Sequence, residues 1–404
     1  MYQSFKFRLY PFRNQGRELL RQQEELRFLW NYALEARQHA WKVEQKSLSY
    51  VDQCRDLARW RAYDKEGIGR VYGHVAQECL ARLHDSFKAF FQHRAKYPHF
   101  KRECTSLTYP DSNGSASLIP GRNGTWRLHL SMVGDLPIEV HRKPHEGKVK
   151  TCTVKREGDR WYAILTIEVP DSVPPSVMPP TRPIGVDLGL TALATLSTGE
   201  KVEPPKFMRK AETHLKRQQR KLSRKVKGSQ NWQKQKVRVA RCHAKVRDQR
   251  RDFAHKLTTG WADAYDLIAF EDMDLRGLTR TRMSKSILDA GWGELRTMSA
   301  YKQRKRSQRY VEVPTKDTTQ SCSICGEKAD PPLTLKDRVF RCPRGHVEDR
   351  DVNAARNVLN RVLAIVRGGT PESTPVETGP TLVRKGRRVR SMKQEPPQAL
   401  GVIA

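Results

Sequence analysis

The stretch Ile184-Gly185-Val186-Asp187-Leu188-Gly189-Leu190 decides the fold of this chain. Four apolar residues alternate here with Gly185, Asp187 and Gly189, which predicts a strand whose apolar side chains share one face. Asp187 then lies on the opposite face between the two glycines. Because glycine has no side chain, a metal ion and a phosphate group have room to approach the carboxylate. We expect a second strand from Thr191 to Leu196, which begins an α/β domain.

A second acidic residue follows a second apolar stretch. Leu267-Ile268-Ala269-Phe270 is a continuous apolar run, which is typical of a central strand covered on both faces. Glu271 stands where the run ends, and α/β folds place their sites at such strand ends. Asp272 and Asp274 come soon afterwards. Strand alternation turns Asp272 to the other side, so we interpret both residues as loop residues or helix caps.

The first stretch taken alone fits two functions. One is a metal-dependent nuclease, in which Asp187 binds the ion, and the other is an ATPase. Its Gly-x-Asp-x-Gly-x-Thr pattern, from Gly185 to Thr191, also resembles the first phosphate loop of actin-like ATPases. Glu271 decides between the two interpretations, because a nuclease needs a second carboxylate at a neighbouring strand end.

A third carboxylate comes from Asp349-Arg350-Asp351-Val352-Asn353-Ala354-Ala355. A helix beginning here buries a stripe that contains Ala355 and Val358, and Asp351 extends that stripe by one turn toward the N-terminus. Asp349 points elsewhere, so we expect it to cap the helix or to face solvent.

Carboxylates from two strand ends and one helix start are what a divalent-metal phosphodiesterase needs. Their hard oxygen atoms select Mg²⁺ or Mn²⁺ over zinc. We predict two Mg²⁺ ions about 4 Å apart, one activating a water and the other stabilising the departing 3′ oxygen. In this interpretation Asp187 bridges both ions, and Glu271 and Asp351 each bind one ion from one side.

A cysteine cluster lies between the second and third acids. Cys322, Cys325 and Cys342 have the spacing of a structural zinc knuckle, but Gly345 stands where a fourth cysteine is expected. The adjacent His346 is the candidate fourth zinc ligand. The other cysteines stand alone and are expected to be reduced thiols: Cys54, Cys79, Cys104, Cys152 and Cys242.

The charge of the chain points to a polyanionic partner. Lys and Arg total 76 against 44 acidic residues, a net charge of +32, and nucleic acid is the leading candidate. From 206 to 251 there are eighteen Lys or Arg and two acidic residues, which predicts two long nucleic-acid-binding helices around Gly228-Ser229. An anionic membrane surface is the alternative partner. No apolar run approaches a spanning helix and no secretory signal opens the chain, so a soluble cytoplasmic protein is expected.

Simpler patterns organise the rest of the chain. Alternation from Phe5 to Tyr10 predicts a strand, and two helical stripes, over 19–34 and 75–91, predict core-facing helices. Short alternating runs split by Gly and Pro, over 108–170, predict a small antiparallel, barrel-like β module. A proline-rich linker follows, and the tail is expected to be disordered.

This joint pattern resembles the TnpB family, transposon-encoded RNA-guided nucleases related to type V CRISPR effectors. The resemblance covers nearly the whole chain. It is carried, in order, by Arg8-Leu9-Tyr10-Pro11, Gly185-Val186-Asp187-Leu188-Gly189, Asp252-Phe253-Ala254-His255-Lys256-Leu257, Glu271-Asp272-Met273, Asp289-Ala290-Gly291-Trp292-Gly293, the Cys322/Cys325 knuckle and Asp349-Arg350-Asp351-Val352-Asn353-Ala354-Ala355.

The resemblance implies a multidomain α/β plus β architecture, with a RuvC-like nuclease domain of ribonuclease H fold and an N-terminal β-barrel-like module interrupted by a helical insert. The expected segments are the first strand of the β (wedge) module over 1–15, the recognition insert over 16–105, the rest of the module over 106–173, a linker over 174–182, the nuclease domain over 183–366 with basic helices 206–262 and zinc knuckle 316–347, and a tail over 367–404.

The resemblance also implies roles and partners. Asp187, Glu271 and Asp351 are the expected catalytic acids, and the expected partners are a guide RNA from the transposon end and a double-stranded DNA target. The protein reads a short motif beside the target while base pairing reads the rest. One site then cuts both strands. The missing fourth cysteine is the departure from the family pattern.

Two rival functions remain open. A DDE-type transposase also uses three acids on this fold and performs strand transfer. A guide-directed repressor binds its target without cutting it, and intact acids argue against this second alternative.

Overall fold

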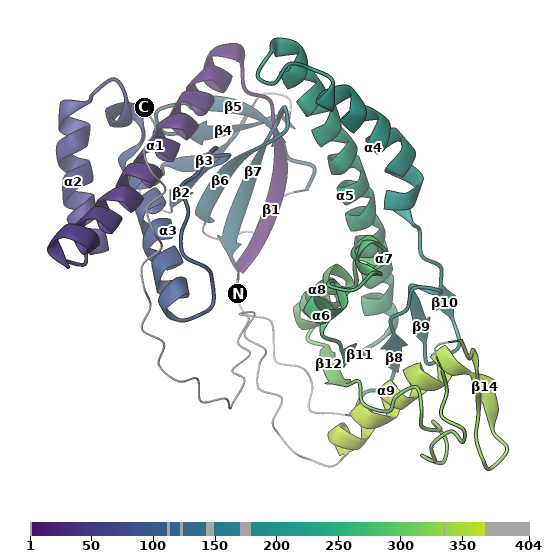
Figure 1. Cartoon of the computed structure of the whole chain (residues 1–404). Coiled ribbons are helices and arrows are strands. Elements are labelled where there is room, and N and C mark those ends of the chain that lie inside the picture. Colours follow the sequence, from purple (N-terminus) through teal and green to yellow (C-terminus); the bar gives the residue numbers. More distant parts are fainter. Residues whose placement is uncertain are drawn as a thin grey trace.

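The computed structural model describes residues 2–110, 114–121, 124–142, 149–169, 179–334 and 336–367. Two sheets organise these residues, one in each half of the molecule, and helices pack on both (Figure 1). The predicted tail lies outside the described residues from 368 onward, and so does the predicted linker up to 178.

The N-terminal sheet has seven strands among the described residues, in the order β2-β6-β7-β1-β5-β4-β3, and all its pairings are antiparallel. Strand β1 lies in the middle, so the first residues of the chain pair with strands more than a hundred residues later. The sheet is curled, because edge strand β3 contacts β6. Its strands are β1 (Tyr2–Leu9), β2 (Ser106–Pro110), β3 (Ala116–Pro120), β4 (Trp126–Leu130), β5 (Gly134–Glu139), β6 (Val149–Glu157) and β7 (Arg160–Glu168).

Three α-helices and a 3₁₀ turn are inserted between β1 and β2: α1 (Arg13–Glu44), α2 (Tyr50–Tyr63), η1 (Ile68–Arg70) and α3 (Gly73–Phe91). Most of the predicted apolar stripes are buried in the core that these helices share with the sheet. Phe91, at the end of the second stripe, is 70% exposed. Phe28 and Tyr32 of the first stripe are exceptions too. Both are about half exposed, at 52% and 51%, because they pack on Trp60 of α2 at the surface instead of entering the core.

The second sheet has the order β10-β9-β8-β11-β12, with β8, β11 and β12 parallel and β9 antiparallel to β8. Its strands are β8 (Pro183–Asp187), β9 (Ala194–Leu196), β10 (Lys201–Val202), β11 (Leu267–Asp272) and β12 (Arg309–Pro314). One face packs on helices α5 and α8, and the other is crossed by α9. Both faces are therefore covered, which explains why the first four residues of β11, Leu267 to Phe270, are all apolar.

The prediction for the first two strands of this sheet was wrong in its bounds. Strand β8 ends at Asp187, and the next strand begins at Ala194 instead of Thr191. A turn intervenes, in which Gly189 N–H donates to Leu193 O. A Cβ atom at Gly189 would lie 2.9 Å from Ala192 O, so this glycine serves a tight turn.

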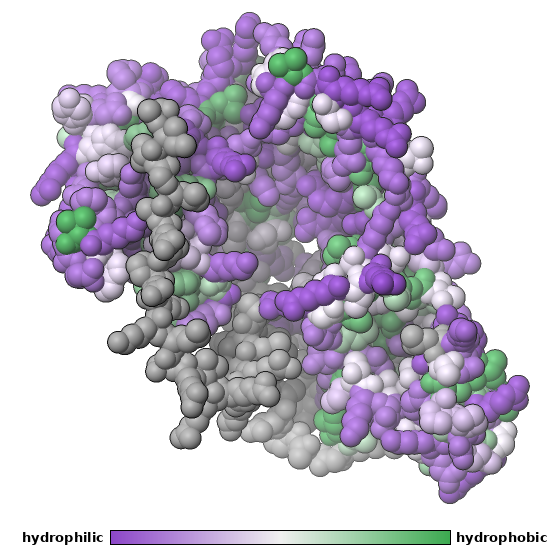
Figure 2. Space-filling view, viewed as in Figure 1, coloured by the Kyte–Doolittle hydropathy of each residue, from purple (hydrophilic) through white to green (hydrophobic). Residues whose placement is uncertain are grey.

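Two long basic helices lie on either side of Gly228: α4 (Phe207–Ser223) and α5 (Gln230–Ala264). Ser229 caps α5 by accepting a hydrogen bond from Trp232 N–H. The two helices form a hairpin that projects from the sheet (Figure 1), and the face shown over them is mostly hydrophilic (Figure 2). No helix among the described residues is long and apolar enough to cross a membrane.

The remaining elements complete the C-terminal half. They are α6 (Leu275–Leu278), α7 (Ser284–Ala290), α8 (Trp292–Lys305), the hairpin of β13 (Val339–Arg341) and β14 (Val347–Asp349), and α9 (Arg350–Arg367). The cysteine-bearing loop leaves β12 and reaches this hairpin, from which α9 starts directly.

Candidate functional site

Asp187 and Glu271 lie side by side at the same edge of the second sheet. Strands β8 and β11 are parallel, and Val186 pairs with Phe270, so the residues that follow each of them are neighbours. Strand alternation places Asp187 on the face of Gly185 and Glu271 on the face of Ala269. This is the face that α9 covers, since Ala269 packs in the same cluster as Val358 of that helix.

Helix α9 supplies the third acid because it lies directly on β8. A Cβ atom at Gly185 would fall 2.1 Å from Ala355 O, so no larger residue fits beneath the helix. Asp351 is one turn before Ala355, which brings it toward Asp187 at the strand end. Gly185 therefore serves helix packing, and the interpretation that this glycine makes room for a phosphate was wrong.

The three acids repel one another electrostatically. Burial raises the pKa of Asp187, and the nearby charges of Glu271 and Asp351 raise it further, to about 8, although Arg350 opposes them. Burial also raises the pKa of Glu271. The site therefore holds more negative charge than its surroundings balance.

Among the neighbouring acids, Asp274 and Asp349 cap helices as predicted, whereas Asp272 is the last residue of strand β11 and not a loop residue or a cap. Asp272 is exposed and pairs with Arg296 at 3.2 Å, and Asp274 accepts hydrogen bonds from the first N–H groups of α6. Asp349 caps α9, because its Oδ1 accepts from Asp351 N–H at 3.1 Å and from the next N–H at 3.2 Å. Lys201 Nζ lies 2.6 Å from the other oxygen of Asp349 and holds this cap in place.

The donor set fits a hard divalent cation. All three groups offer carboxylate oxygen, and Glu271 is 8% exposed with its Oε1 atom buried and without a hydrogen-bond partner. A buried acceptor left unpaired is unfavourable unless a ligand satisfies it. A cation here would pair Glu271 Oε1 and relieve the repulsion around Asp187.

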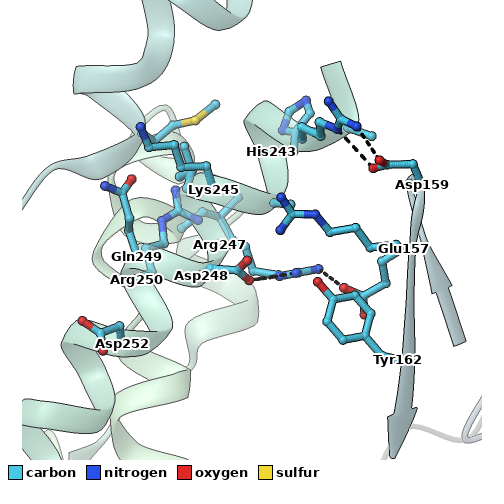
Figure 3. Close-up of a pocket in the computed structure, with 18 of the residues that line it drawn as sticks. Glu157, Asp159, Tyr162, His243, Lys245, Arg247, Asp248, Gln249, Arg250 and Asp252 are labelled. Atoms are coloured by element: carbon cyan, nitrogen blue, oxygen red, sulfur yellow. Dashed lines mark hydrogen bonds and ion pairs between the residues drawn. The ribbon is translucent and has the colours of Figure 1, made fainter. Parts of the chain in front are cut away.

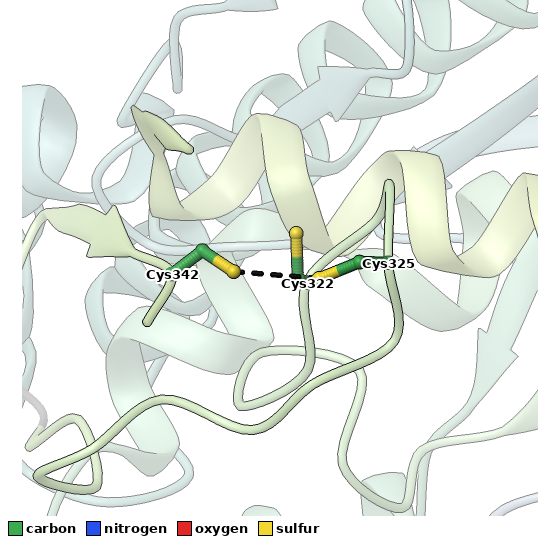
Figure 4. A group of neighbouring side chains, drawn as sticks. All are labelled: Cys322, Cys325 and Cys342. Carbon is green, nitrogen blue, oxygen red and sulfur yellow. Dashed lines mark hydrogen bonds between the residues drawn. The ribbon is translucent and has the colours of Figure 1, made fainter. Parts of the chain in front are cut away.

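The cysteine cluster forms a separate site (Figure 4). The sulfurs of Cys322, Cys325 and Cys342 all lie within 4.8 Å of one another, with 3.4 Å between Cys325 and Cys342. His346 Nδ1 is 3.5 Å from Cys322 Sγ, so the predicted fourth donor is beside the group. Although burial opposes it, backbone hydrogen bonds from Cys325 and Ile324 lower the pKa of Cys322 to about 6. Soft sulfur donors with one imidazole match a structural zinc site.

The described residues also form a basic groove of about 1090 Å³ between the β6–β7 hairpin and α5 (Figure 3). Arg241 pairs with Asp159 at 3.1 Å, and Arg247 pairs with Glu157 at 2.9 Å. None of Asp187, Glu271 and Asp351 lines this groove. Its basic lining consists of Arg160, Arg241, Lys245, Arg247, Arg250 and Lys285.

Sequence reasoning did not single out the polar residues that join these parts. Asn353, Asn357 and Asn360 of α9 bind the backbone of the cysteine loop through their side-chain amides. Their signal in the sequence is three asparagines at helical spacing beside an apolar stripe, where amides are unusual.

Three family profiles match the chain. The OrfB_IS605 profile, described as "Probable transposase", matches residues 165–282. The "Cas12f1-like, TNB domain" profile matches residues 292–358, and a "Helix-turn-helix domain" profile matches residues 1–46. In residues 1–46 the structure has strand β1 followed by the single long helix α1, which forms most of this segment.

Full-length relatives carry one function in their names. A Streptomyces pristinaespiralis protein named "Putative RNA-guided DNA endonuclease" is 35% identical over 99% of this chain and 98% of its own length. The Escherichia coli K12 protein named "Putative RNA-guided DNA endonuclease InsQ" is 31% identical over 100% of this chain and 99% of its own.

Two solved structures share the fold. A Cas12f1 chain, solved with its guide RNA and target DNA, has a TM-score of 0.60 at 12% identity, covering 89% of this chain and 99% of that one. The mini-RNA-guided endonuclease CRISPR-Cas_phi3 has a TM-score of 0.54 at 8% identity, covering 93% and 94%. With full-length relatives at this identity, the chain belongs to the TnpB family of transposon-encoded RNA-guided DNA endonucleases.

Proposed function

We propose that this chain hydrolyses DNA phosphodiesters at Asp187, Glu271 and Asp351, at a target specified by a guide RNA from the transposon end. The observation that carries this proposal is the charge imbalance at one sheet edge, where burial and two neighbouring acids raise the pKa of Asp187. Such a site is unfavourable until cations fill it. The mixed sheet with α9 across one face supports a RuvC-type nuclease domain of ribonuclease H fold.

The positions of the acids support sharing of two Mg²⁺ ions, with Mn²⁺ as a substitute. Asp187 is on the central strand and its charge interacts with both other acids, so we assign it to both ions. Glu271 and Asp351 would each hold one. Bound Mg²⁺ supplies Lewis-acid stabilisation and lowers the pKa of a water. The chain's own contribution is to aim these carboxylates, with Asp349 fixing the start of the helix that carries Asp351.

Three further features support the other parts of the proposal. The cysteine cluster with His346 would hold one structural Zn²⁺ that closes the loop onto the β13–β14 hairpin. The basic helices and the groove would bind phosphate backbones of RNA and DNA, which carry no sequence information. Base pairing to the guide would read the target, beside a short motif read by the protein.

The test is cleavage of a plasmid by the purified protein with its co-purified RNA and Mg²⁺. Asp187→Ala, Glu271→Gln and Asp351→Asn are each expected to lower cleavage at least 1000-fold while target binding survives, because each removes a metal ligand and leaves the basic surface intact. Asp274→Asn, which alters a helix cap near the site, is the matched control and is expected to keep cleavage. Retained cleavage by Asp187→Ala contradicts the proposal. Binding without cleavage by the unmodified protein favours a repressor.

A further inference from the structure

The turn after Cys342 places His346, and not Gly345, beside the other cysteines. Gly345 has a φ angle of +90°, a backbone conformation that residues with a side chain rarely adopt, so a cysteine at this position would be strained. Cys342 N–H donates to His346 O at 2.7 Å, and Gly345 N–H donates to Cys342 O at 2.8 Å. These bonds close the turn and hold His346 against the cluster, with its Nδ1 atom 3.5 Å from Cys322 Sγ.

Glu348 lies on the other side of the same imidazole ring. His346 directly precedes β14 and Glu348 is two residues later, so strand alternation turns both side chains to one face. Glu348 Oε2 is 3.9 Å from His346 Nε2, which is the length of an ion pair and not of a direct hydrogen bond. This oxygen is buried and has no hydrogen-bond partner among the described residues. A buried acceptor of this kind is favourable only when a donor faces it.

Helix α9 holds the other oxygen of Glu348. Arg356 Nη1 lies 2.6 Å from Glu348 Oε1, and Arg356 Nε donates to Ser197 O at 3.3 Å. The Glu348 side chain is only 14% exposed, so little water competes for this pair. Because one oxygen is engaged by the guanidinium, the second oxygen stays directed at the imidazole. The position of Glu348 is therefore set by the helix that also carries Asp351.

We propose that Glu348 is a positioning residue of the zinc site, which holds the His346 ring in the orientation that directs Nδ1 at the sulfurs. The inference rests on the zinc site proposed above. When Nδ1 of a histidine binds a metal, the ring proton is on Nε2. Metal-binding histidines donate this proton to a carboxylate, a carbonyl or a water, which fixes the tautomer and the ring and raises the basicity of the ligand. Glu348 is the carboxylate on that side of the ring.

The alternative is that Glu348 only fastens β14 to α9 through Arg356. Its loss would then loosen the loop whichever residue is the fourth zinc ligand. If Glu348 acts through His346, its loss matters only while a histidine is that ligand, because a thiolate has no ring to orient. The two roles therefore differ in how they depend on residue 346.

The experiment measures zinc affinity in the complete RNA–protein complex, by competition with a chromogenic chelator. Glu348→Leu removes the acceptor and is expected to weaken zinc binding about 10- to 100-fold. Glu327→Leu is the matched control, because Glu327 lies in the same loop and forms an ion pair with Arg344 at 2.7 Å, on the surface of the loop. It is expected to keep zinc affinity within about threefold of the unmodified protein.

The same substitution in a His346→Cys background tells the two roles apart. There Glu348→Leu is expected to change zinc affinity by less than about threefold, because the two positions no longer interact. An equal loss of affinity in both backgrounds overturns the positioning role.

If His346→Cys binds no zinc, the absorption spectrum of the Co²⁺-substituted protein decides instead. The spectrum of Glu348→Leu is expected to shift toward that of His346→Ala, which lacks the imidazole donor. A spectrum that Glu348→Leu leaves unchanged overturns the inference.

The zinc content of the unmodified protein separates this inference from the site on which it rests. Absence of zinc from protein purified without chelator refutes the zinc site itself. Zinc bound by Glu348→Leu with the affinity of the unmodified protein refutes only the role of Glu348. Cleavage at the three carboxylates is tested independently of both outcomes.

Discussion

At the scale of single residues, Asp187 shows how a site of this kind opposes folding. An acid whose pKa rises on folding is harder to ionise in the native state than in the unfolded chain. For Asp187 the pKa rises from 3.8 to about 8, so the native state binds more protons between these values. The contribution of Asp187 to the free energy of unfolding therefore falls as pH rises through this window, and this contribution is lowest above pH 8.

We predict that Asp187→Asn stabilises the metal-free protein at alkaline pH. The midpoint of thermal unfolding is expected to exceed that of the unmodified protein by on the order of 2 °C at pH 8.5 and by less at pH 6, because the amide has no charge to bury. Addition of Mg²⁺ is expected to raise the midpoint of the unmodified protein and not that of the variant.

Differential scanning fluorimetry at several pH values measures the difference in unfolding midpoint between Asp187→Asn and the unmodified protein. Asp56→Asn, on an exposed part of α2, is the matched control and is expected to give a pH-independent difference. A difference for Asp187→Asn that shrinks as pH rises contradicts the repulsion described here.

At the scale of elements, the cysteine loop has little apolar core of its own. Its cluster contains Ala329 and Phe340 with Cys322 and Cys342, and the β13–β14 hairpin is short. A segment this small ordinarily needs a metal or a disulfide to stay folded. The hydrogen bonds from α9 support one side of it, so we expect zinc to stabilise the other.

We predict about one Zn²⁺ per chain, in protein purified without chelator. Cys342→Ser and His346→Ala are each expected to lower zinc content at least tenfold, whereas Cys54→Ser, at a lone thiol of α2, keeps it. Elemental analysis gives the content, and limited proteolysis reports on the loop, which should be cut faster without zinc. Full zinc content in His346→Ala would show that a water or another residue is the fourth ligand.

At the scale of the whole molecule, the two halves meet where positive charge is concentrated. Arg241 and Arg247 of α5 pair with Asp159 and Glu157 of the β6–β7 hairpin, and Lys236 pairs with Glu103 at 3.0 Å. Carboxylates of one half thus sit against the basic helix of the other, in a chain of net charge +32. Nucleic acid phosphates compete for the same arginines, because both are anionic acceptors.

We predict that the double variant Arg241→Gln, Arg247→Gln weakens guide RNA binding and lowers its salt dependence. The slope of log affinity against log salt is expected to fall in magnitude by about 1 for each arginine that contacts phosphate. Filter binding across 50–300 mM salt measures this.

The matched control is the double variant Arg55→Gln, Arg59→Gln on α2, where each arginine forms a local ion pair on the helix surface. It is expected to leave the slope unchanged. An unchanged slope for the α5 variant would place guide RNA binding elsewhere on the molecule.

Several features could be read from the sequence because their signals are local. The alternation around Asp187, the end of the apolar run at Glu271 and the helical phase of Asp351 each depend on the geometry of one element, which is periodic. The same holds for the cysteine spacing and for the break at Gly228-Ser229. These patterns selected Asp351 over Asp349, and the cap that Asp349 forms agrees with that choice.

Other features depend on contacts between distant segments, and no periodic pattern reports those. Only the tertiary structure placed Gly185 under Ala355, gave β1 its position in the middle of a sheet formed much later in the chain, and fastened the cysteine loop to α9 through Asn357. The sequence by itself determined which carboxylates and thiols this protein presents, since residue type and local geometry suffice for that. The packing of α9 decided how they are held, because orientation at a site is set by neighbours from other elements.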